Sequence, residues 1–245
     1  MKKIALFILG ICLFLTSCKQ KEINYTGSSS IDIVLLEEYD LGVSSERKIN
    51  CYSEDELIVI TTEDGIITGK NIGETNVIIE NSVDEISVKV KVSLFEEPTF
   101  DFGCSQDKIK SLYGDPRAVS GDSILIYGSG NEWYSYAVWE MDFFFKDNKY
   151  VEADLYIKNT LDLRLNEFLN DNYFLADTIV DTIDNETRTC YVYLNERDPE
   201  DASLMLGKIY DAGPYNDICL FYLPYKYSEE SGYKGDIITR KRIKK

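Results

Sequence analysis

Histidine is absent from the 245-residue sequence, and this absence excludes several kinds of catalytic and metal site. Without an imidazole there is no His-containing triad, no histidine general base and no zinc site with a histidine ligand. Basic residues are also scarce, because 26 Lys and Arg face 43 Asp and Glu, for a formal net charge of −17. A surface of that sign repels phosphates. We therefore expect no nucleic-acid binding and no attachment to anionic lipid through charge.

Cysteine is limited to six residues, whose spacing matches no CxxC metal pattern. Cys12 and Cys18 lie close to the N-terminus. The others are Cys51, Cys104, Cys190 and Cys219. Buried thiols are the favoured interpretation for these four, and one strand-to-strand disulfide is the alternative. The sequence predicts no metal site and no cofactor.

The N-terminus carries Lys2 and Lys3, followed by an apolar run over residues 4–15. This is the layout of a secretory signal. The run is shorter than the about 20 apolar residues that span a bilayer. It ends in Leu15-Thr16-Ser17-Cys18, which resembles the bacterial lipobox. The resemblance implies removal of residues 1–17, lipid on the Cys18 thiol and anchoring in the cell envelope. The outer membrane is the expected location, and the sequence does not decide whether the protein faces the periplasm or the cell surface.

Residues 18–30 are polar and end in a Gly/Ser cluster, which is typical of a flexible tether. Residues 31–95 then show short strands separated by turns such as Asp64-Gly65, a pattern that favours a β-sandwich. The clearest strand covers residues 86–94, where apolar and polar residues alternate. The segment 65–79, with Gly69 and Gly73, resembles the group 2 bacterial Ig-like domain. That resemblance implies a non-catalytic stalk or adhesive module, and a spacer is the favoured role.

Residues 98–233 mix helices and strands. A helix is predicted from the Ser105 cap to Gly114, followed by strands over 123–127 and 133–146 and a two-residue hairpin at Asp147-Asn148. In the return strand over 151–157, the side chains of Glu152 and Asp154 are expected to face water. A second round predicts a helix over 161–169, strands over 173–182 and 187–194, a helix from Asp198-Pro199 to residue 209, and a closing strand over 217–225. The predicted class is α+β, an antiparallel sheet with helices on one face.

The succession of Gly103, Ser105, Gly114 and Pro116, followed by an aromatic hairpin, is similar to small envelope lipoproteins of the SmpA/OmlA (BamE) type and to β-lactamase inhibitor protein. The resemblance implies a protein-binding scaffold rather than an enzyme. It assigns no functional residue to this chain.

Three groups of residues are candidates for a site. The first is an aromatic cluster that could stack on sugars or hold a protein, although core packing is favoured: Tyr127, Trp133, Tyr134, Tyr136 and Trp139. Acid-rich segments near 181–186 and 196–201 could hold Ca²⁺, but solvated charge is the favoured interpretation. The third group is the carboxylate pair Glu132 and Glu140, which could catalyse glycoside hydrolysis. Only the spacing of the two residues is compatible with this hypothesis, and no other feature supports it.

Residues 234–245 contain six basic residues and one acid. A solvated tail is the favoured interpretation, and contact with a membrane surface or partner is the alternative. Together the patterns predict a lipid-anchored envelope protein that binds another protein without catalysis, as an accessory or assembly factor. Glycan binding through exposed Tyr and Trp is the first alternative, and a carboxylate-dependent hydrolase the second.

Overall fold

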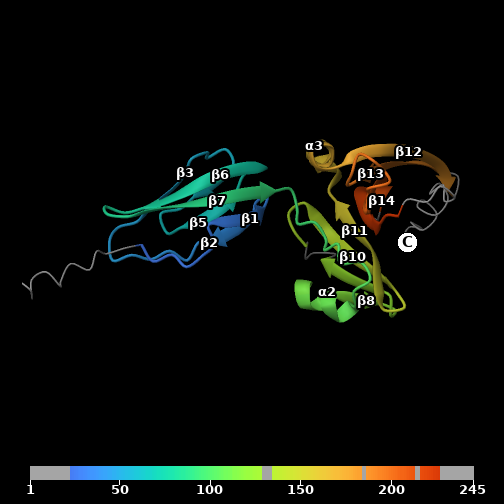
Figure 1. Ribbon diagram of the computed structural model, residues 1–245, viewed down its shortest axis with the longest axis horizontal. Helices are drawn as coiled ribbons and strands as arrows, with labels where there is room; N and C mark the ends of the chain where they lie inside the picture. The colour runs from blue at the N-terminus through green and yellow to red at the C-terminus, as the bar shows by residue number, and fades with distance from the viewer. Residues whose placement is uncertain (1–22, 129–133, 184–185, 213–215, 227–245) are drawn as a thin grey trace, which may run out of the picture. The chain divides into compact units, whose positions relative to one another are not determined.

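The computed structural model describes residues 23–128, 134–183, 186–212 and 216–226 (Figure 1). About half of these residues lie in strands and 12% are helical, so the fold is β-rich. The chain divides into two compact units, Met1–Ser93 and Leu94–Lys245. The predicted signal and lipobox (1–18) and the basic segment 234–245 lie outside the described residues. Within the described part, none of the helices has the length and apolar character needed to cross a bilayer.

The first unit contains two sheets that enclose one hydrophobic core. The four-stranded sheet has the order β1-β7-β6-β3, with β1 parallel to β7, and the three-stranded sheet has the order β2-β5-β4. The strands are β1 (Ser30–Val34), β2 (Glu38–Asp40), β3 (Asn50–Ser53), β4 (Val59–Thr61), β5 (Ile66–Gly69), β6 (Gly73–Glu80) and β7 (Glu85–Ser93). Both sheets contribute to the core, for example through Val59, Ile67, Val77 and Val90.

Strand β7 confirms the alternation predicted for residues 86–94. Val88, Val90 and Val92 are buried, whereas Lys89 and Lys91 between them are exposed. Successive side chains of a strand point to opposite faces, so the valines enter the core and the lysines reach water. The predicted turn at Gly65 is also present, where a φ of 84° is tolerated because glycine has no Cβ.

The second unit is built on one eight-stranded sheet in which every neighbouring pair is antiparallel. The order across the sheet is β12-β13-β14-β15-β11-β10-β9-β8. The strands are β8 (Ala118–Ser120), β9 (Ile124–Gly128), β10 (Val138–Lys146), β11 (Lys149–Ile157), β12 (Phe174–Ile183), β13 (Glu186–Leu194), β14 (Leu204–Ala212) and β15 (Asp217–Pro224). Asp147 and Asn148 join β10 to β11 with φ angles of 52° and 57°, which confirms the predicted hairpin turn.

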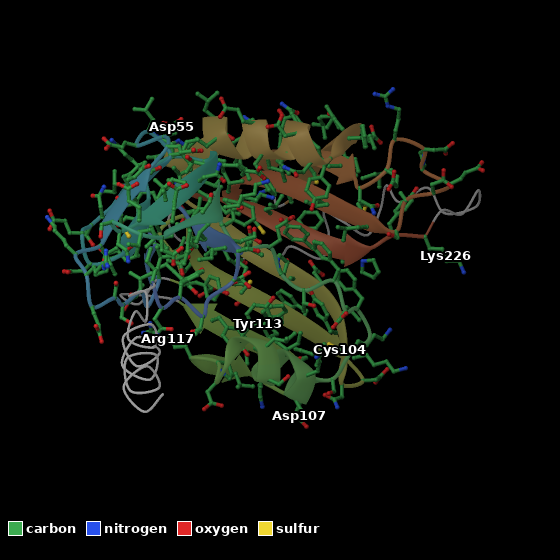
Figure 2. The ribbon with its side chains drawn as sticks, turned by 60° about the vertical axis from the view of Figure 1, so that its left-hand side comes forward. Asp55, Cys104, Asp107, Tyr113, Arg117 and Lys226 are labelled. Atoms are coloured by element: carbon green, nitrogen blue, oxygen red, sulfur yellow. The ribbon has the colours of Figure 1, made fainter. Side chains whose placement is uncertain are left out.

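Helix α2 (Gln106–Tyr113) packs on the sheet through Tyr113, whose ring contacts Tyr127 of β9 and Phe143 of β10. As predicted, the Ser105 side chain accepts the backbone N–H of Lys108, and Gly114 ends the helix with a φ of 78°. Figure 2 labels Tyr113 between the helix and the sheet, and its ring lies 4.9 Å from that of Phe143, centroid to centroid. The apolar side of the helix is thereby fixed on the sheet.

Helix α3 (Asp162–Asn172) follows a short 3-10 turn, η1 (Asn159–Leu161), and lies on the same face of the sheet. Lys208 of β14 binds Asp162 of α3, and the sheet register places Lys208 in one row with Leu220, Leu155 and Met141. Met141 alternates with Phe143, two residues away on the same side of β10. Both helices therefore cover one face, called here the helix face.

The helix predicted from Asp198-Pro199 to residue 209 is wrong. The Asp198 carboxylate accepts the N–H of Glu200 in a short turn, and strand β14 begins at Leu204. Both faces of β14 are buried, so its apolar residues do not alternate with polar ones. A continuous apolar run of this kind is compatible with either a helix or a buried strand.

Two expectations for the long hairpin are also wrong. Strand β10 begins at Val138 rather than Trp133, because Ser135 and Val138 close a tight turn in which the Ser135 N–H donates to the Val138 carbonyl at 2.8 Å. Glu152 and Asp154 of β11 do not face water but are buried. They lie on the face opposite the helices, called here the second face, which is buried as well.

Candidate functional site

The predicted aromatic cluster does not form one exposed surface. Tyr127 and Trp139 are buried, Tyr134 is half-buried, and Tyr136 is 43% exposed. Trp133 lies outside the described residues. Burial removes Tyr127 and Trp139 from the proposed platform, in agreement with the core-packing interpretation for these two residues.

Tyr127 is a core residue of the helix face. Its ring lies 5.7 Å from that of Phe143 and meets it edge-on, and its hydroxyl donates to the Gly114 carbonyl at 3.1 Å. Burial raises the pKa of Tyr127 to about 12. Its hydroxyl therefore stays protonated and fixes the end of α2.

In a regular strand Trp139 would share a face with Met141, but a shift in the β10–β11 register between Val138 and Glu140 changes its direction. Its ring contacts Tyr156, 5.3 Å between centroids. Tyr156 alternates with Leu155, the register partner of Met141, so this contact lies on the second face.

The two other tyrosines of the cluster are partly covered. The Tyr134 hydroxyl donates to Glu96 at 3.3 Å, and the Lys158 ammonium lies 4.0 Å from the centre of the Tyr136 ring. Such a cation over a ring face occupies the surface that a sugar would use for stacking. What remains of the predicted platform is small.

A pocket of about 370 Å³ lies elsewhere in the second unit. Its lining combines hydrogen-bonding side chains with aromatic and aliphatic ones: Glu97, Phe100, Phe102, Asn172, Tyr173, Asn195, Ser203 and Leu204. Oε1 of Glu97 accepts the hydroxyls of both Tyr173 and Tyr222. Burial raises the pKa of Tyr222 well above its usual value, which keeps this donor protonated.

The polar groups of this pocket are held in place. Asn195 accepts the N–H groups of Ser203 and Leu204 at 3.0 Å each, and Asn172 donates to the Phe168 carbonyl at 2.8 Å. Phe100 is 46% exposed as a residue, and its ring stacks against that of Tyr222 with 5.9 Å between the centroids. An exposed ring beside fixed amides and a carboxylate is suited to a polar ligand with an apolar face, such as a sugar.

The residues that line the pocket limit the reactions that it could catalyse. Its lining contains one carboxylate, Glu97, whereas glycoside hydrolysis uses two. Of the earlier carboxylate pair, Glu132 lies outside the described residues and Glu140 is buried in the sheet. Among the described residues, no group of three or more Cys, Asp and Glu side chains is arranged to hold a metal ion.

Strand β12 forms one edge of the eight-stranded sheet, and in the described part of the chain it pairs with β13 alone. Exposed apolar side chains lie along it: Phe174, Leu175 and Val180, the last 62% exposed. Edge strands in soluble proteins usually carry charges, because an open apolar edge pairs with other strands. This edge is therefore a candidate protein-binding surface.

Sequence reasoning missed both the pocket and the edge. The strand over 173–182 was predicted, but its position at the edge depends on pairings between distant segments. Glu97 lies beside the predicted boundary at Pro98, and no local pattern connects it with Tyr173 or Tyr222.

No protein-family model and no curated protein sequence matches the chain. Among solved structures, the chain is similar to domains 5–6 of the S-layer protein SbsC, with 8% sequence identity and a TM-score of 0.27. The match covers 86% of this chain and 98% of the other. A likeness at that level carries no argument about fold or function.

Proposed function

We propose that this chain is a lipid-anchored protein of the bacterial envelope that binds another protein without catalysis. Lipid on Cys18 holds it at the membrane, an Ig-like sandwich acts as the spacer, and an α+β unit carries the binding surface. The edge of β12 is the observation that supports protein binding most directly, because it offers backbone donors and acceptors together with exposed apolar side chains.

The mode of binding that fits this edge is strand addition. A partner segment in extended conformation hydrogen-bonds to the free side of an edge strand, and its alternate side chains contact neighbouring apolar groups. In β12, Leu175 and Val180 supply such groups. The opposite edge, β8, has three residues and gives a much shorter ladder.

A photo-crosslinking amino acid at Thr178 in living cells tests the proposal. We expect one specific envelope protein to be crosslinked, and Val180→Lys to abolish the product because a charge on the edge opposes pairing. Val119→Lys on β8 is the matched control, since Val119 is an edge-strand valine of similar exposure, 53% against 62%. Equal loss with both variants, or no crosslink from β12, would contradict the proposal.

The lipid anchor has its own test. Mass spectrometry of the purified N-terminal peptide is expected to show an acylated Cys18 and no residues before it. Cys18→Ser is expected to release the protein from the membrane fraction. An unmodified Cys18 thiol on a soluble product would disprove the anchor and leave the β12 experiment interpretable by itself.

Glycan binding is the second candidate, and the pocket beside Phe100 now supports it in place of the Tyr/Trp cluster. Phe100 provides a stacking surface, while Asn172 and Glu97 provide hydrogen-bonding groups. On a glycan array, we expect Phe100→Ala to lose binding and Tyr136→Ala to retain it. The reverse result would return the site to the originally predicted cluster.

A further inference from the structure

The pocket beside Phe100 is surrounded by groups of one electrostatic sign. Of the eight described residues that line it, Glu97 is the only charged one. Its Oε1 accepts the hydroxyls of Tyr173 and Tyr222, and hydrogen bonds of this kind favour the ionised form of a carboxylate. Glu97 therefore brings a negative charge, held in place by two donors, to the wall of the pocket.

Helix α3 ends at the same pocket. Asn172 is the last residue of the helix and Tyr173 is its C-cap, and both line the pocket. The carbonyl end of a helix carries a partial negative charge equivalent to about half an elementary charge. The last turn of α3, which the structure describes completely, contains no basic residue that would offset this charge. The helix end therefore acts in the same direction as Glu97 and favours a positively charged ligand.

The rings of Phe100 and Phe102 line the pocket and rest on buried tyrosines of the sheet. Phe100 stacks on Tyr222 of β15, and Phe102 stacks on Tyr150 of β11 with 4.7 Å between the centroids. Because Phe100 is an exposed residue of the pocket wall, a ligand can approach the face of its ring that does not meet Tyr222. The face of an aromatic ring is the negative part of its quadrupole and attracts cations. Phe100 therefore adds to the attraction that Glu97 exerts on positive charge.

The amide groups of the pocket use their donors within the protein. Nδ2 of Asn172 donates to the Phe168 carbonyl at 2.8 Å, and Nδ2 of Asn195 donates to the Ser203 hydroxyl at 3.2 Å. Within the described part of the chain, no group donates to Oδ1 of Asn172. This carbonyl oxygen is an acceptor that a ligand can use. An ammonium group suits it, because it has three N–H donors and no acceptor.

The size of the pocket and the net charge of the chain narrow the class of ligand further. The volume of about 370 Å³ lies near the lower end of the range of roughly 300–1,000 Å³ that is typical of small-molecule sites. The chain carries a formal net charge of −17, and a negative surface raises the local concentration of cations and repels anions. Both properties favour a small organic cation.

We propose that this pocket binds a small ligand through a primary ammonium group. The ammonium lies between the Glu97 carboxylate and the open face of the Phe100 ring, with Oδ1 of Asn172 as a further acceptor. This inference goes beyond glycan binding, because positive charge rather than a sugar ring is the feature that the pocket recognises. It is independent of the lipid anchor and of the partner proposed for β12.

Ligand-observed NMR titration of the full-length protein with D-glucosamine tests the role of charge. At about pH 6 the amine of glucosamine is protonated, whereas glucose, the matched probe, is neutral. We expect glucosamine to bind about tenfold more tightly, because charge-assisted hydrogen bonds are roughly twice as strong as neutral ones. Equal affinity for the two sugars would overturn the proposal and leave neutral glycan binding standing.

Cyclohexylammonium and cyclohexanol form a second pair of probes without sugar hydroxyls. A preference for cyclohexylammonium of about tenfold assigns the pocket to alkylammonium ligands in general. A preference for charge that is seen only with glucosamine assigns it to amino sugars. If neither charged probe binds more tightly than its neutral partner, the proposal is wrong.

Substitution of Glu97 tests the contact itself. Glu97→Gln keeps an oxygen that can accept the two tyrosine hydroxyls but removes the charge, so we expect the preference for glucosamine over glucose to disappear. Glu96→Gln is the matched control, because Glu96 also accepts a tyrosine hydroxyl, that of Tyr134, and is not among the residues that line the pocket. A preference that survives Glu97→Gln, or that Glu96→Gln removes equally, contradicts the proposed contact.

A second pair of variants keeps the test valid if Glu97→Gln does not fold. Phe100→Leu retains an apolar side chain but has no aromatic face, and we expect it to weaken glucosamine binding about threefold. Phe174→Leu is the control, because Phe174 is exposed to a similar extent, 40% against 46%, and lies on β12 outside the pocket lining. Unchanged binding by Phe100→Leu, or equal weakening by both variants, would overturn the proposal.

Discussion

Lys208 gives the sharpest test of how the second unit is held together. Its side chain is 1% exposed, and its ammonium donates to Asp162, Asn166 and Tyr210 at 2.5, 2.6 and 2.6 Å. An ammonium has three donors, so all three are used. The cluster joins β14 to α3, and Tyr210 also donates to Asp162. We predict that Asp162→Asn destabilises this unit strongly.

The magnitude follows from the burial of the two partners. Removing one partner of a buried ion pair typically costs about 3–5 kcal/mol, because the other charge stays buried without compensation. The Asp162 side chain is 33% exposed, so water can screen part of the lysine's charge. We therefore expect the lower end of that range, about 3 kcal/mol, which for a unit of this size is a loss of about 6–12 °C in Tm.

Urea unfolding followed by tryptophan fluorescence is the assay, because both tryptophans of the sequence, at 133 and 139, belong to the second unit. Replacing the pair together, Lys208→Met with Asp162→Leu, is expected to recover most of the loss, since no uncompensated charge remains.

The Lys89–Glu74 pair serves as the comparison, because its atoms lie 2.7 Å apart on half-exposed side chains. Glu74→Gln, followed by calorimetry, is expected to leave the unfolding temperature almost unchanged, because water screens an ion pair at the surface. An effect of Asp162→Asn as small as that would refute the reasoning.

Three further predictions concern other parts of the second unit. Burial raises the pKa of Tyr113 from 10.0 to about 12, so the stability that its neutral hydroxyl contributes is complete below pH 10 and is lost as the pH rises through 12. Between pH 10 and 12, the urea midpoint of the Tyr113→Phe variant should therefore fall less than that of the wild-type protein. Gly207→Ala would place a Cβ 1.9 Å from the Phe221 ring, and we expect a loss of about 1–3 kcal/mol that Phe221→Leu partly restores. Cys190 and Cys219 lie on either side of β14, two strand spacings or about 10 Å apart, which is too far for a disulfide. Both should be alkylated only after unfolding, and a 190–219 crosslink found by mass spectrometry would contradict the register.

Local signals in the sequence predicted much of the secondary structure. The Ser105 cap, the Gly114 stop and the Asp147-Asn148 turn were identified correctly because each depends on residues within one turn of the chain. Strand β7 was predictable because one face is buried and the other is exposed to solvent, so apolar and polar side chains alternate along it. These features need no knowledge of the tertiary structure.

The errors in β14 and β11 share a different physical origin, which is burial of the sheet on both faces. In β14, Leu204 to Ile209 are buried whichever face they occupy, and this erased the period of two that would have separated strand from helix. In β11, Glu152 and Asp154 were assigned to water because they are acidic, although their face is covered. Local sequence reports polarity, but not which face of a sheet another segment covers.

The candidate sites could not be predicted because they depend on pairings between distant segments. Glu97, Tyr173 and Tyr222 come together only through the sheet order, and the buried members of the expected cluster, Tyr127 and Trp139, were placed by the registers of β10 with β9 and β11.

Strand β12 shows how two-sided burial bears on function. Interior strands such as β14 are apolar because both faces are covered. An edge strand bounded by solvent has no such need, and charges there prevent unwanted pairing. Yet β12 exposes Leu175 and Val180, residues of the kind found in an interior strand. Because β12 also carries Asp177 and Asp181, it combines the charges expected of a solvent-facing edge with exposed apolar side chains, and the proposed partner strand would cover the apolar ones.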